Sequence, residues 1–331
     1  MRFQATQARS QAIQLTRTMA SPLLVSTIVL VVLLFAGIIA LPGFGAPSSI
    51  NSVLVLASFL GIASVGETLV VILGGIDLSI PFVVGMTNVM VAQLAFDGLP
   101  FLLAAVVTLL AGTAIGCFNG FASARLKVHP LIITLGVGYA VQGAAEVWTN
   151  GQPMGVPPLW LAWLAATGSR IGGLPIAGVN IVWAVVAVLV VVGLRRSTLG
   201  RQIFAVGTNP VAARLALIDP VVTWTITFGV SGLLAAFAGI LLLGFNGSPI
   251  ATTGDSYLFL AVGAVVIGGT SMIGGRGTYV GTIIGALTII LLQTILAGIG
   301  TSLAVQELLV GLIIIMAVAL FGREANVRDR V

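Results

Sequence analysis

Two acidic residues stand out because they fall within or beside strongly apolar sequence, where a carboxyl group is costly. Glu67 lies within the apolar run Val53–Leu73, and Asp77 follows in the segment Gly74–Ser79. A carboxyl group at membrane depth can couple transport to an ion, line a polar path or bond a neighbouring helix. An ion-driven carrier needs a denser set of such groups. We therefore expect Glu67 to bond another helix or to line a polar path.

Asp77 has two interpretations, one structural and one ionic. Gly74-Gly75 tolerates unusual backbone angles, and Asp77 and Ser79 are both good N-cap residues for the next apolar run. We expect Asp77 to fix a tight cytoplasmic turn between two helices. The alternative is an ionic contact with a partner protein or with a neighbouring loop, for example at Arg201 or Arg276.

The residues needed for other reaction chemistry are missing. Lys127 is the only lysine, His129 the only histidine and Cys117 the only cysteine. A phosphate-binding GxxxxGK[ST] loop is therefore ruled out. A single histidine also disfavours a metal site built from several histidines and a Ser-His-Asp triad. We expect no catalytic residue, no metal and no cofactor in this chain. An intramembrane enzyme is disfavoured, and active transport would need a motor on another chain.

These residues are carried by a chain made almost entirely of long apolar runs. Hydrophobic residues make up 58% and charged residues 7% of its 331 positions. A helix needs roughly 20 apolar residues to span a bilayer. The sequence therefore predicts an all-α polytopic membrane protein, with residues 1–331 in one transmembrane domain of about ten helices. The predicted spans are Pro22–Leu41, Val53–Leu73, Ile80–Phe96, Leu99–Phe121, Leu131–Trp148, Val179–Leu194, Val221–Phe245, Tyr257–Ile273, Tyr279–Leu296 and Leu303–Phe321.

The basic residues mark one side of the membrane. Of 14 lysines and arginines, only Arg170 falls in a gap assigned to the outside. The positive-inside rule then makes both termini cytoplasmic, with a leader at 1–21, a loop at 195–220 and a tail at 322–331. Because these charges are spread over several segments, they indicate topology and contact with lipid, not a nucleic-acid site. They are Arg2, Arg9, Arg17, Arg125, Lys127, Arg195, Arg196, Arg201, Arg214, Arg276, Arg323, Arg328 and Arg330.

The cytoplasmic loop contains a second pattern that a simple connection would not need. Asn209-Pro210 is a helix-start signal, and Pro220 limits the helix to a short one over Val211–Leu217. We interpret this helix as a rigid knob held by another protein, and the missing motor makes a separate ATPase the expected partner. Its small and charged side chains are Ala212, Ala213, Ala216 and Arg214.

Two further patterns concern packing. Tryptophans within Leu159–Leu164 predict a short helix at the outer membrane interface, or else a docking lip for an outside partner. Gly112–Gly116 and Gly281–Gly285 have the GxxxG spacing of closely packed helices. In a glycine-rich chain this spacing favours packing within the chain over dimerisation.

Four segments together resemble a known family. Gly74–Ser79 reads GGIDLS, which is similar to a signature of ribose-type ABC importer permeases, and Thr198–Leu215, Gly268–Thr278 and His129–Gly136 resemble three further motifs of that family. The resemblance marks signature turns at Gly74, Gly75, Asp77, Ser79, Gly268, Gly269, Gly274 and Gly275. It marks ATPase-coupling residues at Gly200, Arg201, Asn209, Pro210, Ala212, Ala213 and Arg214.

The resemblance implies a type II importer permease of the bacterial inner membrane, working as a dimer between a periplasmic sugar-binding protein and ABC ATPase subunits. Three departures are visible: Ile80-Pro81 replaces Val-Gly, Leu217-Ile218 replaces Gly-Ile, and Leu258–Leu260 replaces an acidic ELD. Alternatives are a permease for a nucleoside, an autoinducer or a branched-chain amino acid, and a stand-alone secondary carrier. The sugar, and whether the second permease is a copy or a related chain, stay open.

Overall fold

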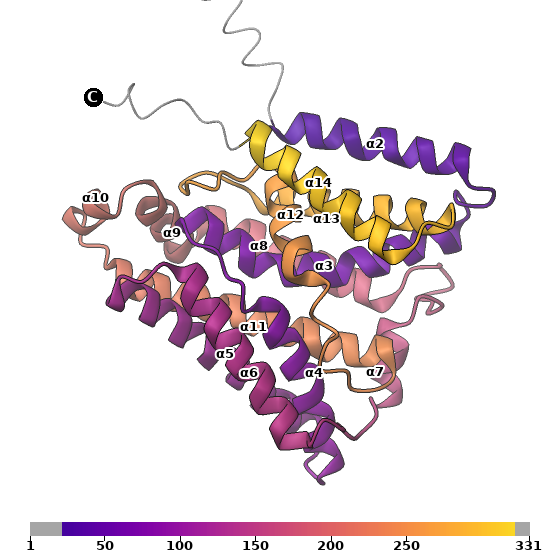
Figure 1. Cartoon of the computed structure of the whole chain (residues 1–331), viewed down its shortest axis with the longest axis horizontal. Coiled ribbons are helices and arrows are strands. Elements are labelled where there is room, and N and C mark those ends of the chain that lie inside the picture. The colour runs from indigo at the N-terminus through magenta and orange to yellow at the C-terminus, as the bar shows by residue number, and fades with distance from the viewer. Residues whose placement is uncertain (1–21, 322–331) are drawn as a thin grey trace, which may run out of the picture.

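The computed structural model describes residues 22–321, so the predicted leader and tail lie outside the described residues. Within that range the chain is helical and forms no strand (Figure 1). The helices are α2 (Pro22–Ala40), α3 (Pro47–Leu73), α4 (Ile80–Phe96), α5 (Phe101–Leu126), α6 (Pro130–Thr149), α7 (Leu159–Ala165), α8 (Gly178–Arg196), α9 (Thr198–Thr208), α10 (Pro210–Leu215), α11 (Pro220–Asn246), α12 (Tyr257–Ile267), α13 (Tyr279–Gly298) and α14 (Leu303–Phe321).

A helix stands at each of the ten predicted spans, although not all are long. Among the described residues, seven helices are long and apolar enough to cross a membrane. The shorter apolar helices α4 and α12 occupy the third and eighth predicted spans, and α14, whose apolar part is counted over Leu303–Met316, occupies the tenth. The count of ten rests on these three helices. The predicted end of α12 at Ile273 is wrong, because the helix stops at Ile267 and a glycine-containing loop follows.

Helix α3 forms the centre of the molecule. It is hydrophobic on all sides, and nearly all of its membrane-spanning part is buried by α11, α13, α12, α8 and α4. Such a pattern is typical of a helix surrounded by other helices. α11 is the second largely buried helix, whereas α2, α5, α6 and α8 leave most of their length exposed, as expected of helices that face lipid.

Glycines allow α5 and α11 to pack with their backbones in contact. A Cβ atom built at Gly116 would lie 2.0 Å from the carbonyl oxygen of Phe228, and one at Gly112 would lie 2.7 Å from that of Gly232. Gly285 does the same between α13 and α12, where a Cβ atom would lie 2.0 Å from the Ala264 oxygen. The GxxxG patterns therefore serve packing within the chain, as expected.

The short helix predicted around the tryptophans is α7. Its Leu161 and Ala165 side chains are buried, and α7 packs on α11 and α8. Trp160 meets Phe101 edge-on, with ring centroids 5.8 Å apart, and half of its surface stays exposed. α7 therefore covers the ends of these helices and presents aromatic surface outward.

A glycine-to-alanine pair tests the close packing. We expect Gly116→Ala to destabilise the protein by about 1–3 kcal/mol, because backbone atoms must move apart to admit the methyl group. Gly136→Ala in α6 is the matched control, since nothing lies within 4 Å of its Cβ position. Thermal unfolding of the purified protein in detergent measures both. Equal melting temperatures would contradict the packing argument.

Candidate functional site

The loop between α8 and α11 forms two capped helices. Asn209 Oδ1 accepts hydrogen bonds from Val211 N (2.9 Å) and Ala212 N (3.0 Å), which confirms the predicted start of α10. The sequence analysis missed α9, which begins where Ser197 Oγ accepts a bond from Gly200 N (2.9 Å). Serine followed by apolar residues at helical spacing was the signal that could have revealed it.

The small-residue surface that we expected on α10 is only partly exposed: Ala212 and Ala216 are exposed, and Ala213 is not. Ala213 is buried against its own chain, and with Ala212 and Ala216 it lines a groove of ≈ 420 Å³ beside α9. Larger apolar side chains are exposed beside these alanines and Arg214: Leu215 is 84% and Leu217 96% exposed. We call Val211, Leu215 and Leu217 the apolar tip.

Leu217 ends the helix in an unusual conformation. Its φ of 61° is left-handed, and Ile218 N then bonds back to the Ala213 oxygen at 3.0 Å. This closing geometry normally uses glycine, because it costs other residues roughly 1–2 kcal/mol. Leu217 adopts this conformation although its side chain is almost fully exposed.

Four glycines join α9 to the end of α3. A Cβ atom built at Gly207 would lie 2.0 Å from the Ile72 oxygen, and Gly275 N donates to that same oxygen at 2.8 Å. A Cβ atom at Gly274 would lie 2.9 Å from the Gly207 oxygen and 3.0 Å from Gly74 Cα. We call Gly74, Gly207, Gly274 and Gly275 the glycine junction. It brings together two of the predicted signature turns and the last turn of α9.

The other signature glycines serve a different contact. Gly268 ends α12, and a Cβ atom there would lie 2.3 Å from the Gly281 carbonyl carbon of α13. Gly269 has a φ of 81° and starts the loop back toward the junction. Of the predicted coupling residues, Gly200 packs against the end of α8, and Arg201 bonds the Arg196 oxygen (3.1 Å) and Thr198 Oγ1 (3.3 Å).

Glu67 and Asp77 are brought together inside the bundle. Asp77 N donates to Glu67 Oε2 at 3.2 Å, and both side chains are buried. Asp77 Oδ1 accepts from Ser79 N (3.1 Å) and Ser79 Oγ (2.5 Å), while Oδ2 accepts from Ser231 Oγ (2.7 Å). Asn119 Nδ2 extends the chain to Ser79 Oγ at 2.8 Å. These five residues form the carboxyl cluster.

The carboxyl cluster changes our interpretation of Asp77. The expected bond to the start of α4 exists, but the turn is not at the surface: residues 74–79 fold back along α3, and α4 begins inside the protein. Among the residues that the structure describes, all hydrogen-bond donors to the Asp77 carboxyl group are neutral, and Arg201 bonds elsewhere. Gly66 makes room for Ser231, because a Cβ atom there would lie 2.3 Å from its hydroxyl oxygen. The expected bond from Glu67 to another helix is not found among the described residues: its partner is the backbone of Asp77, in the segment that follows its own helix.

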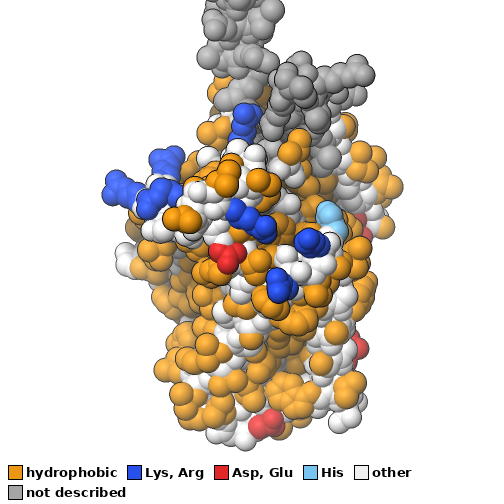
Figure 2. Space-filling model, turned by 90° about the vertical axis from the view of Figure 1, so that its left-hand side faces the viewer, with side chains coloured by type: hydrophobic (Ala, Val, Ile, Leu, Met, Phe, Trp, Pro, Cys, Tyr) orange, Lys and Arg blue, Asp and Glu red, His pale blue; other side chains and the backbone are white. Residues whose placement is uncertain are grey.

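Basic side chains surround the end of the molecule that carries α9 and α10. Figure 2 looks onto it and shows lysine and arginine side chains gathered in the upper half, over the projecting α9 and α10 of Figure 1. We call this the arginine face. It includes Arg125, Lys127, Arg195, Arg196, Arg201 and Arg214.

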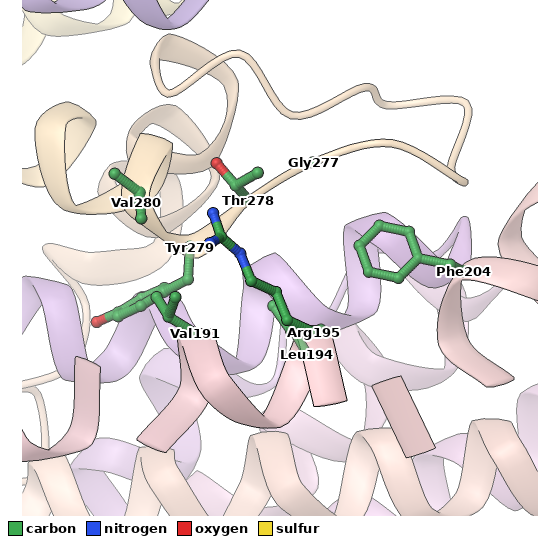
Figure 3. A pocket seen from close by; sticks show the side chains of 8 residues that line it. All are labelled: Val191, Leu194, Arg195, Phe204, Gly277, Thr278, Tyr279 and Val280. Atoms are coloured by element: carbon green, nitrogen blue, oxygen red, sulfur yellow. The ribbon is translucent and has the colours of Figure 1, made fainter. Parts of the chain in front are cut away.

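A small cavity lies between the arginine face and the core (Figure 3). Its volume of ≈ 50 Å³ suits a few waters and not a larger solute. Arg195 points toward Thr278 there, and Tyr279 points away into the bundle, where its hydroxyl donates to the Gly61 oxygen (2.8 Å) and accepts from Trp183 Nε1 (2.9 Å). The hydrogen bonds of Tyr279 therefore make the wall of this cavity rigid, and the cavity is too small to bind a solute.

Comparison with known proteins gives a consistent picture. Residues 49–318 match the family model described as branched-chain amino acid transport system / permease component. A probable ABC transporter permease of Sinorhizobium fredii is 38% identical, covering 78% of this chain and 76% of that protein. The ribose import permease of Haemophilus influenzae is 35% identical (88% and 91% covered), and the fructose import permease of Rhizobium meliloti is 32% identical (91% and 85% covered). No solved structure matches the chain.

Substitutions at Asp77 separate hydrogen bonding from charge. Asp77→Asn keeps an acceptor for Ser79 and a partner for the Ser231 hydroxyl, so we expect nearly unchanged stability. Asp77→Ala leaves buried donors unsatisfied and should cost about 1–3 kcal/mol. Thermal unfolding in detergent distinguishes them. An Asp77→Asn variant as unstable as Asp77→Ala would show that the charge itself is needed.

Proposed function

The chain belongs to the family of branched-chain amino acid transport system permease components, and on this basis we propose that it is the membrane-spanning subunit of an ABC importer for a monosaccharide. It is a multi-pass membrane protein with at least seven helices of spanning length in its described part. The sugar is supported by relatives named as ribose and fructose import permeases that match most of the chain. A motor on another chain is supported by the lack of a GxxxxGK[ST] loop.

The observation that carries the proposal is a capped helix with an apolar tip next to the glycine junction. A free loop gains nothing from exposing Leu215 and Leu217, whereas a helix that enters a groove of a partner buries them. Basic residues around the tip favour an acidic groove rim. We assign this tip to the ATPase, with Ala212 and Ala213 holding α10 on α9.

Force on α10 has a continuous route into the membrane. α10 is bonded to α9, whose Gly207 touches the end of α3, and residues 74–79 connect α3 to α4. The Asp77–Ser231 bond ties that segment to α11, which packs on α3, α4 and α5. In this proposal, ATP binding and release move α10, and the four helices respond together. A second permease, identical or related, and a periplasmic binding protein complete the importer.

Orientation is the first test. In a Cys117→Ala background, Gly168→Cys should label from outside and Leu215→Cys from inside, because the arginine face belongs in the cytoplasm. Both positions are exposed, so labelling reports sidedness and not burial. A membrane-impermeant thiol reagent on intact cells and on inverted vesicles measures this. Labelling of both residues from one side would refute the placement of α10.

Docking is the second test. Leu215→Asp puts a charge where the proposal places an apolar groove, so binding-protein-stimulated ATP hydrolysis should fall about tenfold or more. The control is Leu126→Asp, an equally drastic change of an exposed residue at the end of α5, outside the apolar tip. The reconstituted complex provides the measurement. Full stimulation with Leu215→Asp, at normal amounts of inserted protein, would remove the apolar tip as the docking site.

A further inference from the structure

A crevice opens between α12, α13 and α14 at the end of the molecule remote from the arginine face. It consists of two adjoining cavities of ≈ 400 and ≈ 300 Å³, which share Ser256, Leu260, Gln293 and Leu303. Each volume lies in the range of about 300–1,000 Å³ that is typical of small-molecule sites. The start of α12, the last turns of α13 and the start of α14 form its walls, so it opens near these helix ends.

Several polar groups that line the crevice have no partner within the described residues, whereas Thr294 bonds the Ile290 oxygen of its own helix. Gln293 lies in an otherwise apolar stretch of α13, and within the described residues nothing hydrogen-bonds its amide. The same is true of the Tyr257 hydroxyl and of the Ser256 hydroxyl. Gln306 uses its NH₂ group on the Thr301 oxygen at 3.0 Å, which leaves its own carbonyl oxygen available. An unpaired amide inside a membrane helix is costly, so its retention indicates contact with water or a ligand.

The lining defines the chemistry of that ligand. Amide and hydroxyl groups both donate and accept hydrogen bonds, and Leu260, Leu303 and the Tyr257 ring supply apolar walls. No basic residue lines either cavity, while Asp255 and Glu307 line the second one. An anion would be repelled there. A neutral molecule with several hydroxyl groups and an apolar C–H face fits these walls.

We propose that this crevice binds the neutral, hydroxyl-rich solute on its way into the membrane domain, with Gln293 and Tyr257 as its hydrogen-bonding residues. The inference rests on the proposed function, which supplies the direction of transport and the sugar. A lipid headgroup carries similar hydroxyl groups, so the test must separate a dissolved sugar from a lipid.

The first experiment probes the crevice directly. Leu303→Cys, which lines both cavities and leaves Gln293 and Tyr257 intact, should react with a charged, membrane-impermeant thiol reagent in the Cys117→Ala background and in proteoliposomes, and D-ribose or D-fructose should slow the reaction severalfold. Val188→Cys in α8 is the control for a lipid-facing position and should stay unreactive. If Leu303→Cys is unreactive, the crevice is closed or lipid-filled, and the proposal fails. Reaction without protection by either sugar would also overturn it.

The second experiment uses the complete importer. Gln293→Leu and Tyr257→Phe should each lower sugar uptake about fivefold, as expected for the loss of hydrogen bonds to the solute. Binding-protein-stimulated ATP hydrolysis should persist, since α10 is untouched. Gln142→Leu in α6 is the control for loss of an amide elsewhere and should transport normally. If the unmodified importer takes up no sugar, the proposed function fails. If it does and both crevice variants match it, only the crevice inference fails.

Discussion

Contact between backbones, made possible by glycine, is the constraint on which this structure depends. Lipid tails are as apolar as leucine side chains, so helices in a bilayer gain little from hydrophobic burial and must gain from close packing. Gly112 and Gly116 provide this for α5 and α11, and Gly281 and Gly285 provide it for α12 and α13. The same kind of contact joins α9 to α3 at Gly207. The same device therefore holds the membrane part together and attaches α9 and α10 to it.

The carboxyl cluster complements this packing with a polar anchor. Residues 74–79 leave α3 at its end and return into the bundle, where their backbone needs partners that lipid cannot supply. Glu67 accepts from Asp77 N, and Thr134 accepts from Leu78 N at 3.1 Å. The signature segment is thus explained by the need to satisfy a chain that re-enters the protein between two helices.

The sequence predicted the elements better than the contacts between them. Apolar runs located the spans, and Asn209-Pro210 located α10, because these signals are local. The fold-back at Asp77 was missed because it depends on Ser231 and Asn119, which are distant in the sequence. The burial of Ala213 was missed for a related reason: α9, the helix that covers it, had been interpreted as loop. Sugar preference and partner contacts stay beyond what the chain alone predicts.

The glycine junction also has a mechanical consequence. Where two elements touch through long side chains, a small displacement of one is absorbed when those side chains change rotamer, and little motion arrives at the other. At Gly207 and Gly275 the contact is between main-chain atoms, which have no rotamers to change. The joint between α9 and α3 therefore has very low compliance, and a displacement of α9 is passed to α3 with little loss.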